Sequence, residues 1–179
     1  MSARPRTYRP LSLERESLAR LLPIGEAFRH VDRVIGYADG SARGLRTEVT
    51  FLPDDPIFAA HFPGRPVVPG SKLIEFAAQS AGVLAGIEWF RASLVASNRD
   101  ADDVFSLAAS PRSDAPGGRR AAMLASADLK FIRVVTPGER LTCEVWITRI
   151  LGGLWRFDVE LWTKPVVASG SIVLGVEVS

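Results

Sequence analysis

Two ionisable side chains, His61 and Glu75, flank a proline-rich segment and are the residues of this sequence best suited to proton transfer. The segment reads HFPGRPVVPG and is followed by SKLIEFAAQSAG. Proline fixes the backbone φ angle, so the three prolines between the histidine and the glutamate would hold the imidazole in a defined place. A histidine and a carboxylate in fixed positions can act as a general base and a general acid.

Gly70 adds a third chemical group, because it opens the helix predicted for the residues that follow. Its backbone N–H lies at the positive end of the helix dipole and can bind a carbonyl oxygen. Together the three groups suit removal of a proton α to a carbonyl with loss of a β-hydroxyl: Gly70 binds the carbonyl, neutral His61 takes the proton and protonated Glu75 donates to the hydroxyl. Burial would raise the pKa of Glu75 toward this role, whereas the helix dipole would lower it.

Each of these residues also has a purely structural interpretation, and the pattern alone leaves both open. Glu75 would then be an exposed glutamate that balances the helix dipole, and His61 a loop histidine whose ring bonds a backbone carbonyl. His30, on an alternating segment, is interpreted as structural. Cys143 lies in a strand-like run, LTCEVWI, with no histidine near it, which argues against a thiol nucleophile.

One long helix is predicted to position these residues. The segment Lys72–Leu94 contains no proline and is rich in alanine and leucine. Its apolar residues go round almost the whole circumference, which predicts a buried central helix. Glu75, Gln79, Gly82 and Gly86 share one stripe of this helix, and a stripe of that kind can border a narrow channel.

Segments rich in β-forming residues lie on both sides of the helix. Strands are predicted at Phe28–Tyr37, Arg43–Leu52, Ala121–Val135, Glu139–Leu151, Leu154–Lys164 and Val166–Val178. A short helix capped by Ser12 is predicted through Leu22, and Val95–Arg120 is predicted to be an exposed loop with one short strand, Asp103–Ala108. The sum is an α+β protein, with an antiparallel sheet curled around the central helix. Such a sheet leaves edge strands, which favours self-association.

Composition limits the class of protein. The chain has 179 residues, of which 47% are hydrophobic and 23% charged, as in a globular domain. We expect a flexible extension at residues 1–10 and one domain at 11–179, with a loop insertion near 95–120. One cysteine and two histidines argue against a metal site, and no cofactor is expected. The net charge of +2 does not indicate nucleic-acid binding, and the absence of a signal-like or membrane-spanning segment predicts a cytoplasmic protein.

The segment HFPGRPVVPGSKLIEFAAQSAG resembles the active-site segment of the β-hydroxyacyl-acyl carrier protein dehydratases of the FabZ/FabA group. Two further stretches resemble that family in the same order: Leu22-Pro23 through Phe28 to Val31-Asp32-Arg33-Val34, and Lys130-Phe131 through Pro137-Gly138-Glu139. The resemblance implies a hotdog fold, a sheet around a central helix. It also implies an obligate dimer whose interface contains a tunnel for the acyl-phosphopantetheine arm of an acyl carrier protein.

The same resemblance assigns roles to individual residues. It implies that His61 is the catalytic histidine, that Glu75 is contributed by the other subunit, and that Gly70 donates to the thioester carbonyl. Four residues would line the tunnel: Phe62, Val68, Phe76 and Gln79. This chain departs from the family pattern where Val68 replaces methionine, where Ser71 and Lys72 replace an aliphatic pair, and where Phe76 replaces a small residue.

Several cations are candidates for contact with a carrier protein. Lys72 either reaches the surface or meets the phosphate of the pantetheine arm. Four others either form a basic patch for an acidic carrier protein or are scattered surface charges: Arg119, Arg120, Lys130 and Arg133.

The resemblance implies a dehydratase that converts a (3R)-3-hydroxyacyl carrier-protein thioester to the trans-2-enoyl thioester, as a homodimer or a heterodimer. Glutamate at position 75 resembles the branch that only dehydrates. The pathway would be fatty-acid synthesis or a polyketide or polyene type of synthesis, and the insertion and extension favour a specialised one. A hotdog thioesterase and a non-catalytic partner subunit of a heterodimeric dehydratase are the alternatives. Retention of both His61 and Glu75 argues against the partner subunit.

Overall fold

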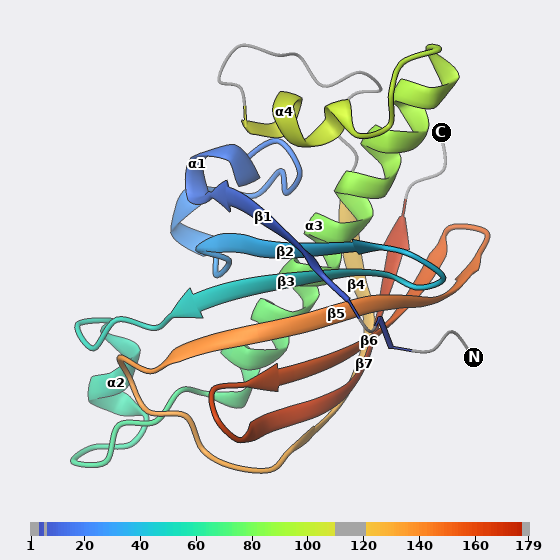
Figure 1. The fold of residues 1–179 in the computed structure, drawn as a ribbon. Coiled ribbons are helices and arrows are strands. Elements are labelled where there is room, and N and C mark those ends of the chain that lie inside the picture. Colours follow the sequence, from blue (N-terminus) through green and yellow to red (C-terminus); the bar gives the residue numbers. More distant parts are fainter. Residues whose placement is uncertain (1–3, 6, 110–120, 177–179) are drawn as a thin grey trace.

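A seven-stranded antiparallel sheet curls around one long helix (Figure 1). The computed structural model describes residues 4–5, 7–109 and 121–176. The strands are β1 Arg9–Glu14, β2 Arg33–Asp39, β3 Arg43–Thr50, β4 Ala122–Phe131, β5 Arg140–Leu151, β6 Leu154–Trp162 and β7 Val166–Val176. The helices are α1 Arg15–Leu18, α2 Ile57–Ala60, α3 Gly70–Ala96 and α4 Asp103–Ala109, with a 3-10 helix η1 at Glu26–Phe28. This is the hotdog arrangement that we expected.

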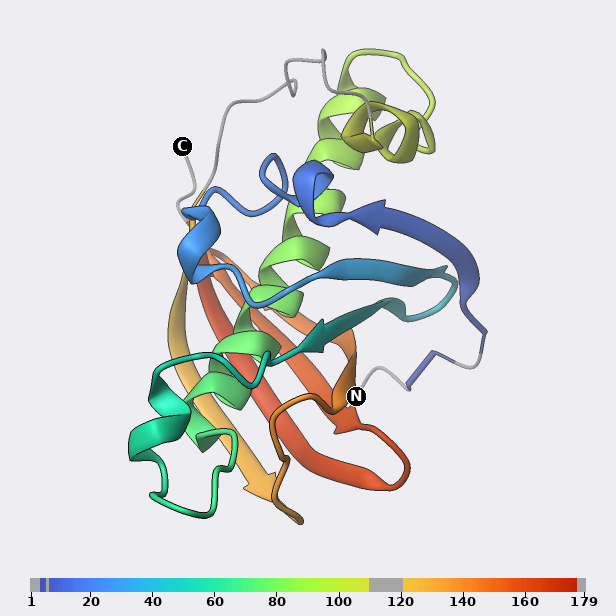
Figure 2. The same cartoon turned by 90° about the vertical axis from the view of Figure 1, so that its left-hand side faces the viewer.

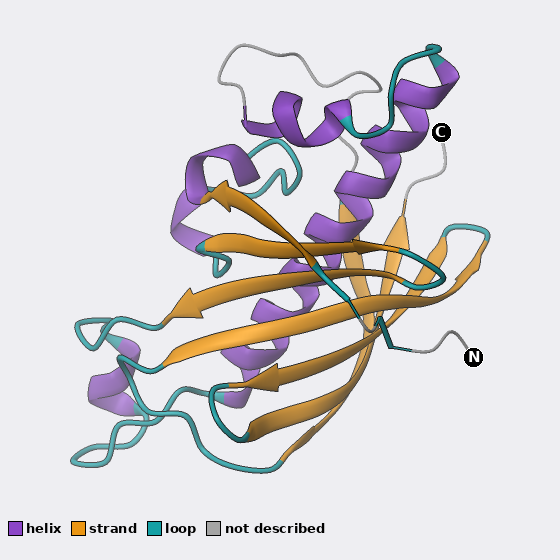
Figure 3. Cartoon of the chain, in the orientation of Figure 1, coloured by secondary structure: helices purple, strands orange, loops and turns teal. Residues whose placement is uncertain are grey.

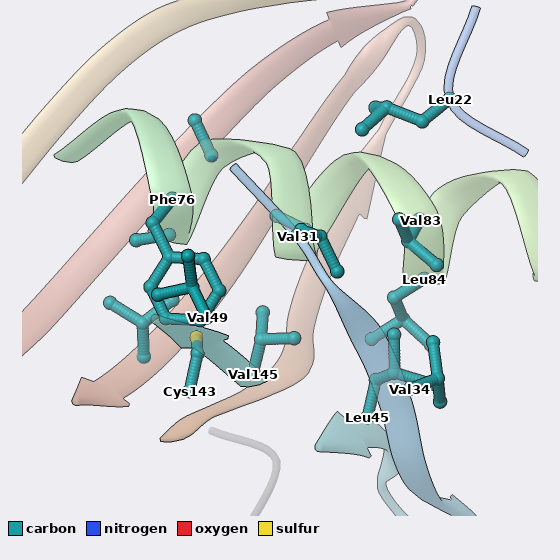
Figure 4. Packing of buried hydrophobic residues seen from close by; sticks show 14 of the residues in the cluster. Leu22, Val31, Val34, Leu45, Val49, Phe76, Val83, Leu84, Cys143 and Val145 are labelled. Carbon is teal, nitrogen blue, oxygen red and sulfur yellow. The ribbon is translucent and has the colours of Figure 1, made fainter. Parts of the chain in front are cut away.

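Helix α3 is the core of the molecule. It starts directly after Pro69 and runs for 27 residues without proline. Buried residues occur all round it, because the sheet covers most of its circumference. Figure 4 shows Phe76 of α3 close to Val49 and Cys143 of the sheet. Burial of each large apolar side chain contributes about 1.5 to 3 kcal/mol, so packing is the main source of the helix's stability.

The sheet has the order β1-β2-β3-β5-β6-β7-β4, so that β4 and β1 form its edges. Among the described strands β4 pairs only with β7. Most of β4 is exposed, including Met123, Leu124 and Phe131, and Figure 2 shows it along one side of the curled sheet. A long exposed edge strand is a template for pairing with another chain. This edge is therefore the part of the sheet best suited to contact a second subunit.

The central elements agree with the sequence-based prediction. The predicted helix at Lys72–Leu94 is α3, and the predicted hairpin is the antiparallel pair β2 and β3. The four C-terminal strands occur as β4 to β7, within a few residues of the expected bounds. Strand β2 begins only at Arg33, because residues 26–28 form η1 and residues 29–32 lie outside any regular element.

The N-terminal region differs from the prediction. The helix expected from Ser12 to Leu22 is instead strand β1 followed by a single helical turn, α1. Leu13 is buried while its neighbours Ser12 and Glu14 are exposed, so the segment alternates and pairs with β2. This tertiary pairing outweighs the local helix signal. Strand β1 also starts inside the segment expected to be flexible, and Arg4 forms ion pairs with Glu144 and Glu160.

The insertion after α3 also differs. The predicted strand at Asp103–Ala108 is wrong, because residues 103–109 form helix α4. Val104 and Ala108 lie four residues apart and are both fully buried, which is helical and not strand spacing. Residues 110–120 of the expected loop lie outside the described residues. None of the helices in the described ranges is long and apolar enough to cross a membrane.

Candidate active site

The His61 ring is held by its own loop. His61 follows the single turn of α2, and its backbone N–H donates to Ile57 O at 2.9 Å. Its Nδ1 lies 3.2 Å from Val67 O. Because a carbonyl oxygen only accepts, Nδ1 is the donor, and in the neutral ring this leaves the lone pair on Nε2. This geometry suits a base, although the structural interpretation of His61 also contains a bond to a backbone carbonyl.

The loop that carries His61 is closed at its base. Val67 N–H donates to His61 O at 3.1 Å, and Val68 N–H donates to Val135 O at 2.8 Å. The ring of Phe62 stacks on the His61 ring with centroids 4.3 Å apart. Phe62 is 57% exposed, so its outer face is free among the described residues to meet a partner. Val68 is buried and anchors the loop to the body of the protein.

Glu75 belongs to a buried polar network on α3. Gln79 Nε2 donates to Glu75 Oε1 at 2.9 Å and to Phe28 O at 2.8 Å, and Gln79 Oε1 accepts from His30 N–H at 2.7 Å. Glu75 is half-buried, whereas Gln79 is 3% exposed. Since Oε1 of Glu75 already accepts from the amide, a proton on this carboxyl belongs on Oε2. Gln79 is thus occupied by three hydrogen bonds and sets the orientation of Glu75.

The other two candidate nucleophiles or bases are structural. His30 packs between the rings of Phe28 and Phe51, and burial lowers its pKa. Cys143 is fully buried beneath α3, and burial raises the pKa of its thiol to about 12. A protonated, inaccessible thiol is a poor nucleophile. Both interpretations made from the sequence are consistent with these positions.

Gly70 opens α3 with no side chain to shield its backbone. Its N–H makes no hydrogen bond to the described residues, and it lies at the N-terminus of a long helix. A Cβ at this position would lie 3.3 Å from the ring of Phe131, at the end of β4. Glycine therefore permits close packing of Phe131 on the start of the helix. With no acceptor among the described residues, the N–H is a donor of the type that stabilises a carbonyl oxygen.

The two glycines of the α3 stripe, Gly82 and Gly86, are partly covered by the segment that contains Leu21 and Leu22. A Cβ on Gly86 would lie 2.6 Å from Leu21 O, and one on Gly82 would lie 3.0 Å from Leu22 Cδ1. A small apolar cavity of about 50 Å³ remains beside Gly82, next to Trp89. The stripe therefore borders open space near Gly82 and is closed by the chain at Gly86. Phe76, expected to line a tunnel at the subunit interface, has no exposed surface in the single chain and packs in its core.

The cations expected to contact a carrier protein differ in whether they form ion pairs. Lys72 forms an ion pair with Asp55 at 2.6 Å, and its side chain is 18% exposed. Arg133 pairs with Glu139 at 2.7 Å and also donates to Thr163. Lys130 is exposed and has no ion pair with the described residues. Arg119 and Arg120 lie outside the described residues.

His61 and Glu75 do not form a hydrogen bond or ion pair with each other within the described chain. Their elements are neighbours, since α2 lies beside the first turns of α3 in Figures 1 and 2. Sequence reasoning missed three further residues of this region. Val67 orients His61 through a backbone carbonyl, which leaves no signal in the sequence. Asp55 and Phe131 are common residue types whose role depends on contacts with α3.

Two family models match consecutive parts of the chain. The model of the FabA-like domain matches residues 22–101, and that of the thioesterase superfamily matches residues 101–168. The chain is 32% identical to the 3-hydroxyacyl-[acyl-carrier-protein] dehydratase FabZ of Coxiella burnetii, over 79% of this chain and 82% of the relative. It is 29% identical to the FabZ of Anaplasma marginale, over 92% of this chain and 96% of the relative.

Two solved structures are similar in fold along nearly the whole chain. The dehydratase heterocomplex ApeI:P from Xenorhabdus doucetiae aligns with a TM-score of 0.61 and 19% identity, covering 97% of this chain and 94% of that one. An uncharacterised protein of Pyrococcus horikoshii aligns with a TM-score of 0.51 and 14% identity, covering 96% of each chain. At these identities the similarity shows the hotdog fold alone.

Proposed function

Because this chain belongs to the FabZ family of 3-hydroxyacyl-[acyl-carrier-protein] dehydratases, we propose that it removes water from a (3R)-3-hydroxyacyl carrier-protein thioester to form the trans-2-enoyl thioester. The observation that carries the proposal is the His61 ring, whose Nδ1 is engaged by Val67 O so that Nε2 is left as the base. The helix that follows supplies the carboxyl and the carbonyl-binding N–H that the reaction also needs.

In the proposed reaction the thioester carbonyl accepts a hydrogen bond from Gly70 N–H. His61 Nε2 takes the α-proton, and the electrons of the broken C–H bond become the new C=C bond as the C–OH bond breaks. Glu75 Oε2 gives its proton to the departing hydroxyl, which leaves as water. The imidazolium and the carboxylate then exchange a proton to restore the starting state. Every group in this cycle belongs to the chain, so the proposal requires no resident metal or cofactor.

We propose further that His61 of one subunit works with Glu75 of another. The two side chains are not joined within the described chain. The exposed edge strand β4 ends at Phe131, which lies against Gly70, so a partner that pairs with β4 would also reach the start of α3. Pairing through β4 is therefore compatible with completion of each site by the second subunit. Either a homodimer or a heterodimer would satisfy this geometry.

The end of the sheet nearest the His61 loop is suited to binding an acyl carrier protein. The loops from β3 to α3, from β4 to β5 and from β6 to β7 gather at this end in Figure 3. Four exposed cations there have no ion pair with the described residues: Arg65, Lys130, Arg140 and Lys164. Exposed apolar side chains, including Ile132 and Val134, accompany them. Such a surface favours an acidic protein that delivers an apolar arm. Of the cations expected from the sequence, Lys130 remains in this proposal.

Two alternatives have specific support. The thioesterase superfamily model matches the C-terminal half, which favours hydrolysis of a thioester as the second candidate. The similarity to a dehydratase heterocomplex favours a chain that needs a different partner subunit. A specialised pathway such as polyketide or polyene synthesis stays a prediction from the sequence. The buried thiol of Cys143 gives no support to a covalent thioesterase, and the complete set of His61, Glu75 and Gly70 favours the dehydratase.

One experiment separates these functions. The purified chain is incubated alone with 3-hydroxyacyl carrier-protein thioesters of short, medium and long acyl chains, and intact mass is followed. Loss of water from the acyl group supports the proposed dehydratase. Loss of the whole acyl group would show a thioesterase. An unchanged mass with the chain alone, and loss of water once a second hotdog subunit is added, would show the heterodimer.

A further inference from the structure

We infer that the ion pair between Lys72 and Asp55 positions the His61 loop against helix α3, which makes both residues positioning residues for the proposed dehydration. The inference rests on the proposed role of His61. Lys72 Nζ lies 2.6 Å from Asp55 Oδ2. Lys72 is in the first turn of α3, whereas Asp55 lies in the segment that joins β3 to α2. The pair therefore connects the helix that bears Glu75 with the loop that bears His61.

Asp55 is connected to His61 by a short series of hydrogen bonds. Its second carboxylate oxygen accepts from Ile57 N–H at 3.0 Å, and its carbonyl accepts from Phe58 N–H at 3.0 Å. These bonds hold the first turn of α2. At the end of the same turn His61 N–H donates to Ile57 O at 2.9 Å. A displacement of Asp55 is thus transmitted to His61 through a single turn of helix.

The surroundings favour a persistent contact. The Lys72 side chain is 18% exposed and that of Asp55 is 31% exposed, so both are partly shielded from water. Lys72 Nζ also lies 5.9 Å from the centroid of the Phe51 ring. The hydrogen bonds from Lys72 and from Ile57 N–H lower the pKa of Asp55, which keeps the carboxylate charged at neutral pH.

The position of Lys72 is explained by this partner. A cation in the first turn of a helix opposes the helix dipole, so the lysine lowers the stability of α3 unless its charge is used elsewhere. The far side of the His61 loop is fastened by the hydrogen bond from Val68 N–H to Val135 O and by the buried Val68 side chain. The near side has the Lys72–Asp55 pair as its link between side chains. The loop is therefore held at both ends, and at the near end the link to α3 is an ion pair that a single substitution removes.

A set of matched variants tests the inference. Lys72→Met and Asp55→Asn each remove the ion pair, and Asp55→Asn keeps an acceptor for Ile57 N–H. Lys72→Arg retains the pair, and the double variant completes a mutant cycle. Arg91→Met is the control, because Arg91 is also on α3, is 16% exposed and pairs with Asp102 at 2.9 Å. It lies about 28 Å along the helix from Lys72.

Two readouts are taken from each variant. The first is kcat and KM for dehydration of a 3-hydroxyacyl carrier-protein thioester. The second is the tautomer of His61, from long-range proton–nitrogen NMR spectra of the two imidazoles in this sequence, with His30 as reference. We expect Lys72→Met, Asp55→Asn and the double variant each to lose about ten-fold in kcat with KM within about two-fold, because His61 is misplaced while substrate binding remains. In the same three variants we expect His61 to change from the Nδ1–H tautomer alone to a mixture of the two neutral tautomers. Lys72→Arg and Arg91→Met are expected to keep the wild-type kcat and the single Nδ1–H tautomer.

Two results would overturn the inference. One is a folded Lys72→Met or Asp55→Asn protein with wild-type kcat and a single Nδ1–H tautomer. The other is an equal loss in Arg91→Met. A mixed tautomer with unchanged kcat would support the positioning of His61 by the ion pair and contradict the proposed catalytic role of His61. Failure of the inference and failure of the proposed function are therefore distinguishable.

Discussion

The side-chain amide of Gln79 donates a hydrogen bond to Glu75 Oε1 at 2.9 Å, one turn away on α3. The same amide bonds the backbone of Phe28 and His30, on the segment before β2. Gln79 is 3% exposed, so these bonds are shielded from water. One buried side chain thus orients Glu75 and fastens this segment to the central helix.

Replacement of Gln79 is therefore expected to affect both stability and activity. Gln79→Leu removes the hydrogen-bond partner of Phe28 O and of His30 N–H, which are both part-buried, and this should lower the free energy of unfolding by about 2 kcal/mol in urea titrations. It also frees Glu75 and should lower kcat. The control is Ser80→Ala, which removes a neighbouring buried hydroxyl that bonds Thr47 and Phe76 but not Glu75. Equal loss of kcat in both variants would contradict a specific effect on Glu75.

The proposed base and acid are each expected to be essential. His61→Ala and Glu75→Gln should each lower kcat/KM by at least about 100-fold, the usual range for general acid–base groups. Both side chains are half-buried and lie outside the core, so the melting temperatures should stay within a few degrees of wild type. Mass spectrometry of the acyl carrier protein and thermal unfolding provide the two measurements. Near-normal activity in either variant would refute its assigned role.

Complementation tests whether the two residues act across subunits. A heterodimer of one His61→Ala chain and one Glu75→Gln chain, purified through two different tags, contains one intact site if each site uses both chains. It should recover about half of the wild-type activity. Sites formed within one chain would both be damaged, and the heterodimer would then be as inactive as its parents.

Acid should remove the contribution of the Glu139–Arg133 pair. The hydrogen bond from Arg133 lowers the pKa of Glu139 from 4.5 to about 2, and bonds from Thr136 act in the same direction. A carboxyl whose pKa is lowered by folding stabilises the fold above its unfolded pKa, and this stabilisation is lost as the pH falls toward its folded pKa. Glu139→Gln should therefore cost about 1 kcal/mol at pH 7.

The difference between wild type and Glu139→Gln should shrink as the pH falls from 4.5 to about 2, as measured by urea unfolding at several pH values. Glu26→Gln, at a side chain that is 81% exposed, is the control and should stay within about 0.5 kcal/mol of wild type at pH 7. A difference that persists unchanged at pH 2 would show that the charge of Glu139 is not its source.

At position 86 the protein is expected to be more stable with glycine than with alanine, the opposite of the usual order in helices. Alanine normally stabilises a helix by about 1 kcal/mol relative to glycine. At this position its Cβ would lie 2.6 Å from Leu21 O, a backbone atom that cannot easily move. Gly86→Ala should therefore destabilise the protein by about 1 to 3 kcal/mol in thermal or urea unfolding. The exposed Ala92 on the same helix is the control, since Ala92→Gly should cost about 1 kcal/mol. A higher melting temperature for Gly86→Ala would contradict the close packing of Leu21.

Much of the fold could be predicted because its signals are local. The segment that became α3 contains no proline and has apolar residues round almost its whole circumference, and both properties can be read from that segment alone. The C-terminal strands are separated by Pro-Gly and Gly-Gly pairs, which interrupt regular structure wherever they occur. The predictions failed at β1 and α4, where short segments carry mixed signals and their partners decide the outcome.

The sequence by itself determined the central helix, most of the strands around it and the candidate residues His61, Glu75 and Gly70, because these follow from residue types and their spacing along single segments. Only the tertiary structure decided that Val67 orients His61, that Gln79 holds Glu75 and that Lys72 pairs with Asp55. The first of these uses a backbone carbonyl, which looks the same in every residue. The pairing of Lys72 with Asp55 and the bonds of Gln79 to the backbone of Phe28 and His30 join residues from different parts of the chain. Their meeting depends on how the sheet curls around α3, and this is settled only when the whole core packs.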